Sequence, residues 1–307
     1  MSGPLAGRVA LVTGGGRGIG RAIVEALHGA GAAVVIADHG TGIDGTGADP
    51  LVARDLAARL GARAAAYPQS IASPGSAAAA VALATERFGA LDILVNNAAI
   101  LRDFFLFKAD PLAWDAVIRT NLSAPFYMLA AASPLLRDQA RAGRGGGTWG
   151  RVINIVSTAG LYGNFGQAAY ASAKAGLLGL TRVAALDLQR SGVACNALAP
   201  FAATRVTDTV KPANPAQAAY KERALKVPAA AVAELAAWLA GDEAQGVSGQ
   251  LFGVRGRELF LFSQPRPKAR LERQAGEALG AMIARDLAPH YVELGTDLEA
   301  FSGEPLV

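Results

Sequence analysis

A glycine-rich turn close to the N-terminus constrains the possible folds of this chain more than any other feature. Residues 13–20 read Thr-Gly-Gly-Gly-Arg-Gly-Ile-Gly, and they separate an apolar strand pattern at residues 8–12 from a helix pattern that ends near residue 30. A second apolar strand pattern follows at residues 33–37. Glycines let the backbone approach a pyrophosphate closely, and the first turn of the helix offers N–H groups and the positive end of its dipole. This order of elements predicts a dinucleotide-binding site.

Strand and helix patterns alternate through most of the remaining chain. Further strand patterns end near residues 67, 95, 156 and 198, and residues 251–262 contain a last strand or hairpin around Gly256. Such alternation is typical of a parallel sheet with helices on both faces. We therefore expect an α/β fold with a doubly wound, mostly parallel, seven-stranded Rossmann-type sheet, followed by a C-terminal extension.

The alternation also favours a single dinucleotide-binding domain over residues 1–264. Within it, residues 201–228 are rich in Ala, Thr and Pro and lie between a strand and a helix, which is typical of a substrate lid. The composition shifts at Pro265, where the extension over residues 265–307 begins. We predict an amphipathic helix at residues 269–287, and we expect the extension to pack on the lid or on a neighbouring subunit.

Asp38 ends the second strand pattern, where a carboxylate can accept hydrogen bonds from both ribose hydroxyls. It would repel a 2′-phosphate, and neither of the next two residues is Arg or Lys, so NAD is favoured over NADP. Arg17 in the glycine turn can still meet a phosphate, which keeps NADP as the alternative. Gln69 and Ser70 follow the third strand pattern and can either bond the adenine edge or cap a loop.

Tyr170 and Lys174 stand four residues apart in a helix pattern, so they lie on one face of that helix. Because a nearby ammonium favours the phenolate, we predict a lowered Tyr170 pKa that suits acid–base work near neutral pH. Ser157 follows the strand pattern at residues 152–156, where its hydroxyl can bond a carbonyl oxygen. Alone, the four-residue spacing of Tyr170 and Lys174 also fits an ordinary pair of side chains on a helix surface. Asn121 interrupts another helix pattern, either as an irregularity or as a water-holding group.

Composition argues against several classes of protein. The net charge of +4 is mild and no block of like charges occurs, which argues against nucleic-acid binding and suits a polyanionic small molecule. Cys195 is the only cysteine, so we expect neither a disulfide framework nor a metal site. No charged-then-apolar leader and no apolar run of about 18 residues is visible. We therefore expect a soluble, cytoplasmic protein without a membrane span.

The chain resembles the short-chain dehydrogenase/reductase family over about residues 5–255. The resemblance is carried, in order, by the glycine turn, Asn96-Asn97-Ala98, Asn121, Ser157, Tyr170-x-x-x-Lys174 and Ala199-Pro200. It implies that Asn121, Ser157, Tyr170 and Lys174 form the catalytic set. The residues that it implies for cofactor binding are Gly14, Arg17, Gly18, Ile19, Gly20, Asp38, Gln69, Ser70, Asn97, Ala98, Tyr170, Lys174, Pro200 and Ala203.

Residues 100–103, 162–168 and 199–207 also resemble the 3-hydroxyacyl-CoA dehydrogenase part of peroxisomal multifunctional enzyme type 2 and its stand-alone bacterial relatives. This resemblance implies oxidation of a fatty or steroid side-chain 3-hydroxyacyl-CoA to the 3-ketoacyl-CoA with NAD, by a homodimer or homotetramer. Three alternatives stay open. They are reduction of a 3-oxoacyl thioester, oxidation of a steroid or cyclic alcohol, and a non-catalytic dinucleotide-binding scaffold.

The chain departs from the usual family pattern at four places. Gln69 stands where Asp or Asn is usual, and Ala99 follows Asn96-Asn97-Ala98 in place of Gly. Phe201 follows Ala199-Pro200 where Gly is usual, and Arg255 stands where many members have one glycine of a pair. None of these departures removes a group of the implied catalytic set.

Overall fold

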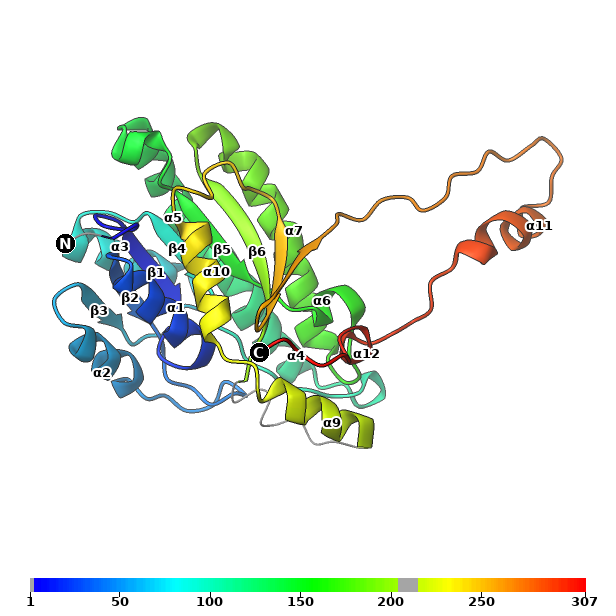
Figure 1. Ribbon diagram of the computed structural model, residues 1–307, viewed down its shortest axis with the longest axis horizontal. Helices are drawn as coiled ribbons and strands as arrows, with labels where there is room; N and C mark the ends of the chain where they lie inside the picture. Colours follow the sequence, from blue (N-terminus) through cyan, green and yellow to red (C-terminus); the bar gives the residue numbers. More distant parts are fainter. Residues whose placement is uncertain (1–2, 204–214) are drawn as a thin grey trace.

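The computed structural model describes residues 3–203 and 215–307, and these form one twisted sheet between two layers of helices (Figure 1). The order of the strands in the sheet is β3-β2-β1-β4-β5-β6-β7-β8. The strands β1 to β7 are parallel, and β8 pairs antiparallel with β7. Their bounds are Val9–Thr13, Ala33–Ala37, Ala64–Tyr67, Ile93–Asn96, Arg151–Ile155, Ala194–Phe201, Leu251–Arg255 and Glu258–Phe262.

The predicted fold class is confirmed, and the predicted number of strands is one too low. The chain turns back at Gly256, whose φ of 57° is left-handed, so residues 251–262 form a hairpin instead of one strand. A Cβ atom at Gly256 would also lie 2.2 Å from the carbonyl oxygen of Leu306. Glycine is therefore required at this turn both by the backbone conformation and by the C-terminal residues packed on it.

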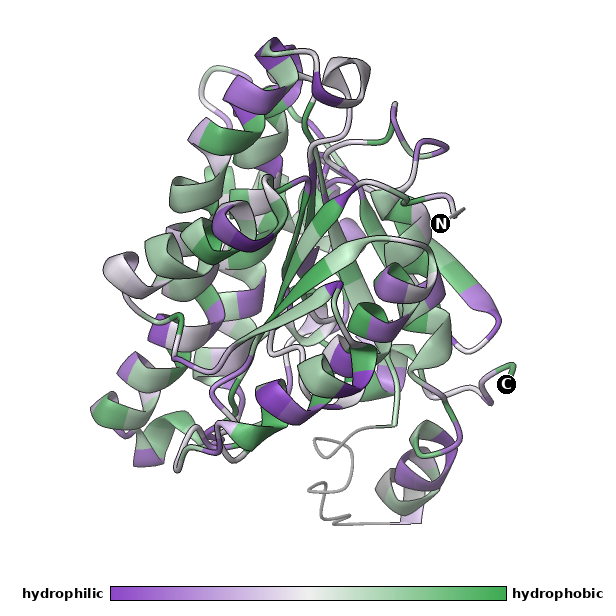
Figure 2. Ribbon diagram, turned by 90° about the vertical axis from the view of Figure 1, so that its left-hand side faces the viewer, coloured by the Kyte–Doolittle hydropathy of each residue, from purple (hydrophilic) through white to green (hydrophobic). Residues whose placement is uncertain are grey.

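Each face of the sheet is covered by helices that bury an apolar stripe. The helices α1 (Gly18–Gly29), α2 (Leu51–Leu60) and α10 (Ala230–Ala240) pack on one face. The helices α3 (Pro74–Phe88), α5 (Ala124–Arg141) and α7 (Ala168–Leu188) pack on the other face. Figure 2 shows the largely hydrophobic strands between these two layers. A strand buried on both faces explains the continuous apolar runs in the sequence.

The sheet order reverses beside β1, and this places a crevice at the carboxyl ends of the strands. The loop after β1 leads to α1 on one face, and the segment after β4 leads through α4 (Pro111–Ile118) to α5 on the other face. These two loops diverge above the sheet. The glycine turn and the Asn96-Asn97 pair thus face one another although about 80 residues separate them in the sequence.

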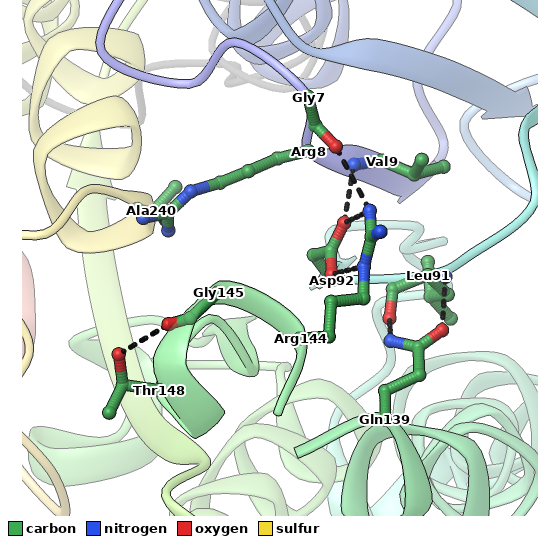
Figure 3. A network of polar contacts seen from close by, with 10 residues as sticks. All are labelled: Gly7, Arg8, Val9, Leu91, Asp92, Gln139, Arg144, Gly145, Thr148 and Ala240. Carbon is green, nitrogen blue, oxygen red and sulfur yellow. Dashed lines mark hydrogen bonds and ion pairs between the residues drawn. The ribbon is translucent and has the colours of Figure 1, made fainter. Parts of the chain in front are cut away.

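A network of charged side chains lies at the amino-terminal ends of β1 and β4, at the end of the sheet opposite the cleft (Figure 3). The carboxylate of Asp92 is 1% exposed and accepts two hydrogen bonds from Arg144, from Nε at 2.6 Å and from Nη2 at 2.8 Å. It also accepts a hydrogen bond of 2.8 Å from the backbone N–H of Val9. The guanidinium groups of Arg8 and Arg144 both lie over the Trp149 ring, 4.8 and 5.5 Å from its centre. Arg144, which follows α5, is thereby tied to the residue that precedes β4.

The C-terminal extension leaves the body of the protein and returns to it (Figure 1). The predicted helix at residues 269–287 is wrong over its first ten residues, because helical structure begins only at α11 (Leu279–Met282). An amphipathic segment without a packing partner gains little from forming a helix. The chain returns at α12 (Asp297–Ala300), which packs against α6 (Ala159–Tyr162). The division into a domain and an extension near residue 264 stays a prediction.

No helix within residues 3–203 and 215–307 has both the length and the apolarity needed to cross a membrane. The same residues contain no group of three or more His, Cys, Asp or Glu side chains placed to hold a metal ion.

Candidate active site

A cleft of about 810 Å³ opens at the carboxyl ends of the strands, around the glycine turn. Every residue that the sequence predicts for cofactor binding lines this cleft, with the exception of Ala203. The backbone N–H of Ala203 instead donates a hydrogen bond of 2.7 Å to the carbonyl oxygen of Val227. Residues 204–214 of the predicted lid at residues 201–228 lie outside the described residues, and residues beyond them form α9 (Pro215–Ala224).

The glycine turn is held in place by Asn97, the residue that follows β4. Asn97 Nδ2 donates to the carbonyl oxygens of Thr13 and Gly14, each at 3.0 Å. Gly14 has a φ of 61°, and a Cβ atom there would lie 2.8 Å from the Cα atom of Ala98. The N-cap residue Arg17 makes no side-chain cap to α1 within the described part of the chain. The turn and the first N–H groups of α1 therefore form a cradle that fits a pyrophosphate.

Asp38 lines the adenosine end of the same cleft in a fixed orientation. Its Oδ2 atom accepts a hydrogen bond from the backbone N–H of Gly16, and its Oδ1 atom accepts one from Gly40, both at 2.8 Å. Each carboxylate oxygen can accept a further hydrogen bond. The pair of oxygens therefore fits the two hydroxyls of a ribose and presents a negative charge to any 2′-phosphate.

Lys174 and Tyr170 lie at the other end of the cleft. Lys174 is 3% exposed, and its Nζ atom donates a hydrogen bond of 2.7 Å to the carbonyl oxygen of Ile155. Burial lowers the pKa of Lys174 from 10.5 to about 8. Its Nζ atom lies 5.6 Å from the centre of the Tyr170 ring, over the face of the ring.

The sequence predicts a lowered Tyr170 pKa, and that prediction is wrong. Burial raises the pKa of Tyr170 from 10.0 to about 12; a hydrogen bond with Ser157 counteracts part of this rise, and the charges of Asp297 and Asp103 add to it. The ammonium of Lys174 is directed at a backbone carbonyl, so desolvation of the phenolate outweighs its attraction.

Asn121 is fully buried and lies outside both the cleft and the pocket described below. It sits in a π-helical segment, Arg119–Ser123, so of the two sequence-based alternatives the helix irregularity is present. Its side chain makes two hydrogen bonds of 2.9 Å with the backbone of Ile100, one to the N–H and one to the C=O. Asn121 therefore ties the segment after β4 to the junction of α4 and α5, and its water-holding role stays a prediction.

A second pocket, of about 220 Å³, adjoins the cleft and contains Ser157. The residues that line both spaces are Ile19, Leu101, Tyr170 and Pro200. Tyr170 therefore lies at the boundary between the cleft and the pocket that contains Ser157. Ser157 and Tyr170 thus line the same pocket.

Part of the wall of this pocket comes from the C-terminal extension. Asp297 is 9% exposed and accepts a hydrogen bond of 3.1 Å from Thr158 Oγ1. Arg255 Nη1 donates to the carbonyl oxygen of Phe301 at 2.9 Å, and the ring of Phe301 lies 4.6 Å from that of Phe201. Arg255 and Phe201 are two departures from the usual family pattern, and both hold the extension in place.

This arrangement combines a phosphate cradle, a carboxylate that fits a ribose, and a partly buried tyrosine with a buried lysine beside a serine hydroxyl. The sequence profile of the short chain dehydrogenases matches residues 8–218. The chain belongs to the short-chain dehydrogenase family. Members of this family are oxidoreductases that bind a nicotinamide dinucleotide, which agrees with the shape and the polarity of the cleft.

Similar proteins include hydroxyacyl-CoA dehydrogenases. Hydroxyacyl-CoA dehydrogenase ChsB1 of Mycobacterium tuberculosis is 40% identical over 266 residues, which is 87% of this chain and 83% of that protein. Peroxisomal multifunctional enzyme type 2 of Drosophila melanogaster is 37% identical over 211 residues, 67% of this chain but 33% of that protein. The crystal structure of a short chain dehydrogenase from Mycobacterium avium superimposes with a TM-score of 0.80 at 34% identity, covering 96% of this chain and 99% of that one. The predicted resemblance is confirmed.

The lowered pKa of Lys174 predicts that this residue costs folding free energy at neutral pH. Below pH 8 the side chain is charged in both states, and only the folded state buries the charge. Between about 8 and 10.5 the unfolded chain binds more protons, so this cost disappears as the pH rises. After the lost hydrogen bond to Ile155 is deducted, Lys174→Met should stabilise the fold by about 2 kcal/mol at pH 7. Denaturant unfolding at pH 7 and pH 10.5 measures this difference.

The exposed Lys268 offers a matched control for that experiment. Lys268→Met should change the free energy of unfolding by less than about 0.5 kcal/mol at either pH. A Lys174→Met protein that is less stable than the parent at pH 7, or equally stabilised at both pH values, would contradict the assignment of a desolvated ammonium at this site.

Proposed function

We propose that this protein is an NAD-dependent dehydrogenase that oxidises a 3-hydroxyacyl-CoA, of fatty or steroid side-chain type, to the 3-ketoacyl-CoA. The observation that carries this proposal is the position of Tyr170, between the dinucleotide-shaped cleft and the pocket that contains Ser157. A secondary alcohol in that pocket meets the phenol and the serine hydroxyl from one side. The carbon atom that bears the hydroxyl then faces the cleft, which Tyr170 also lines.

NAD supplies a hydride acceptor when it is bound in the cleft. Ser157 Oγ bonds the substrate oxygen and fixes its distance to the Tyr170 hydroxyl, and Tyr170 removes the proton of the alcohol. Lys174 Nζ holds the nicotinamide ribose, and Asn121 keeps the neighbouring backbone in place for a water that exchanges the proton with solvent. A positioned acid–base group contributes about 10²- to 10⁴-fold in rate, and orientation of the reacting carbon supplies much of the remainder.

The raised pKa of Tyr170 predicts how the rates of oxidation and reduction depend on pH. With a pKa of about 12, the phenol is protonated at pH 7 and is ready to donate a proton, which favours reduction of a ketone. Oxidation needs the phenolate. At pH values below the pKa, each increase of one pH unit raises the phenolate population about tenfold. The rate of alcohol oxidation should therefore increase steadily from pH 7 to pH 10, while the rate of ketone reduction should not increase.

The preference for NAD over NADP is supported by Asp38, whose carboxylate faces the ribose end of the cleft. Arg17, which also lines the cleft, is the group that favours the opposite choice. We further propose a cytoplasmic homodimer or homotetramer. Exposed apolar side chains on α5 and α7, among them Phe126 at 52% and Leu186 at 72%, support association through these helices.

A kinetic panel tests the proposal. Absorbance of the reduced nicotinamide is followed with short, medium and long 3-hydroxyacyl-CoA thioesters of both configurations, a steroid side-chain acyl-CoA, a free steroid alcohol and a cyclic alcohol, each with NAD and NADP. In the reverse direction, 3-oxoacyl thioesters are supplied with NADH and NADPH. Turnover of one or more CoA thioesters with NAD is the expected result. Turnover only of 3-oxoacyl thioesters with NADPH would favour a reductase, turnover only of free alcohols a steroid or cyclic alcohol dehydrogenase, and binding without turnover a scaffold.

A further inference from the structure

The loop between β2 and α2 is anchored on the segment that follows β4. The backbone N–H of Leu101 donates a hydrogen bond of 2.8 Å to the carbonyl oxygen of Ile43. Arg102 Nε donates a second one, of 2.7 Å, to the carbonyl oxygen of Asp44. Because β2 and β4 lie on either side of β1, these segments meet across the end of the strand that leads into the glycine turn. We call residues 40–46 and 100–102 together the clasp.

Both sides of the clasp line the cleft. Thr41 and Gly45 do so from the loop after β2, and Leu101 and Arg102 do so from the segment after β4. A dinucleotide that reaches from Asp38 to the Tyr–Lys pair has to pass the glycine turn, and the clasp bridges the cleft at that point. The bound molecule therefore lies against the clasp along its central part.

The loop side of the clasp is a preformed turn. The backbone N–H of Gly42 donates to the carbonyl oxygen of Thr46 at 2.7 Å, and Asp44 Oδ1 accepts hydrogen bonds from the N–H of Thr46 at 3.0 Å and from its hydroxyl at 2.8 Å. Gly45 has a φ of 83°, and a Cβ atom there would lie 2.9 Å from Ile100 Cδ1. The turn thus packs against the opposite segment so closely that no side chain fits between them.

We propose that the clasp retains the bound dinucleotide and that Arg102 is the positioning residue that holds the clasp shut. The dinucleotide leaves when the hydrogen bonds from Leu101 to Ile43 and from Arg102 to Asp44 open together, as in other enzymes whose loops gate release. The proposal rests on the part of the proposed function that places a dinucleotide in the cleft, and it does not depend on which alcohol is oxidised.

Two substitutions loosen the clasp from opposite sides. Arg102→Ala removes the hydrogen bond to Asp44, and Gly45→Ala forces a Cβ atom against Ile100 without changing any charge. We expect each variant to raise the dissociation rate of NADH by about five- to tenfold, with a smaller change in the association rate. The matched control is Gly47→Ala, because Gly47 has a φ of 72° in the same loop but a Cβ atom there meets nothing within 4 Å.

Stopped-flow displacement of NADH from the full-length protein, followed by nicotinamide fluorescence, measures these rates; NADPH is run in parallel. Two results support the proposal: NADH dissociates faster from both variants, and its dissociation rate from Gly47→Ala stays within about twofold of the parent. In the double variant, the increase in the dissociation rate should not exceed the product of the two single increases. Unchanged release in both variants overturns the proposal. Faster release in Arg102→Ala alone, abolished by high salt, also overturns it, because the guanidinium would then act directly on a phosphate.

The failure of this proposal and that of the proposed function can be told apart. A parent protein that binds neither NADH nor NADPH refutes the proposed function itself. If the parent binds NADH and turns over a CoA thioester, but neither substitution changes the dissociation rate of NADH, only the proposed role of the clasp is refuted.

Discussion

Replacing Tyr170 by Phe should lower kcat/KM by about 10³-fold and leave NADH binding within about threefold of the parent. Only the hydroxyl is removed, so the ring still packs over Lys174 and still separates the cleft from the second pocket. The lost group is the one that exchanges a proton with the substrate oxygen, and its partner Ser157 cannot replace it, because a serine hydroxyl is far less acidic than a phenol. Steady-state kinetics and fluorescence titration with NADH measure the two effects separately.

Tyr162 provides the control for this substitution, since it is 41% exposed and lines neither the cleft nor the second pocket. Tyr162→Phe should keep kcat/KM within about twofold. Turnover by the Tyr170→Phe protein close to that of the parent would remove the phenol from the mechanism. An equal loss of turnover and of NADH binding would instead show that Tyr170 has a structural role.

The residues that meet at the cleft could be predicted because each follows a strand. The glycine turn, Asp38, Asn97 and Pro200 stand at or next to the carboxyl ends of β1, β2, β4 and β6, and a parallel sheet brings these ends to one side of the sheet. Local patterns in the sequence therefore sufficed to place side chains that are far apart in the chain. Ser157 likewise comes after a strand, β5, and lines the second pocket together with Tyr170.

The contacts made by the C-terminal extension could not be predicted in this way. Asp297 reaches Thr158 across 139 residues, and no periodic pattern in residues 265–307 indicates where the chain returns to the body. The only local signals were Phe201 and Arg255, which the sequence showed as departures and the structure shows as anchors. Departures from a family pattern at a pocket wall thus indicated a contact with a segment outside that pattern.

The Tyr170 pKa was missed for a related reason. Spacing in the sequence places Lys174 on the same helix face, but it does not give the direction of the ammonium or the depth of burial. The carbonyl of Ile155 takes the hydrogen bond of Lys174, and desolvation then dominates the titration of both side chains. The burial that costs stability at Lys174 is the same burial that excludes water from the reacting groups.

The largest effect on stability is expected from a substitution of Asp92, at the amino-terminal end of β4. Asp92→Asn should destabilise the fold by about 3 kcal/mol, because an amide has one acceptor oxygen where the carboxylate serves both Arg144 and the backbone N–H of Val9. The new amide nitrogen would face a donor, and the guanidinium would lose a buried counter-charge. Thermal unfolding should show a fall in Tm of roughly 6 °C or more, with turnover at low temperature unchanged.

Two comparisons separate the ion pair from a general sensitivity of the fold to carboxylate removal. Asp138 pairs with Arg137 at the surface and is 60% exposed, so Asp138→Asn should cost less than about 0.5 kcal/mol. Arg144→Met alone leaves the 1% exposed Asp92 without its counter-charge, whereas combining it with Asp92→Asn removes both charges. The double variant should therefore be less destabilised than the sum of the single variants. Strict additivity, or a loss below about 1 kcal/mol for Asp92→Asn, would show that strand packing holds this end of the sheet without the ion pair.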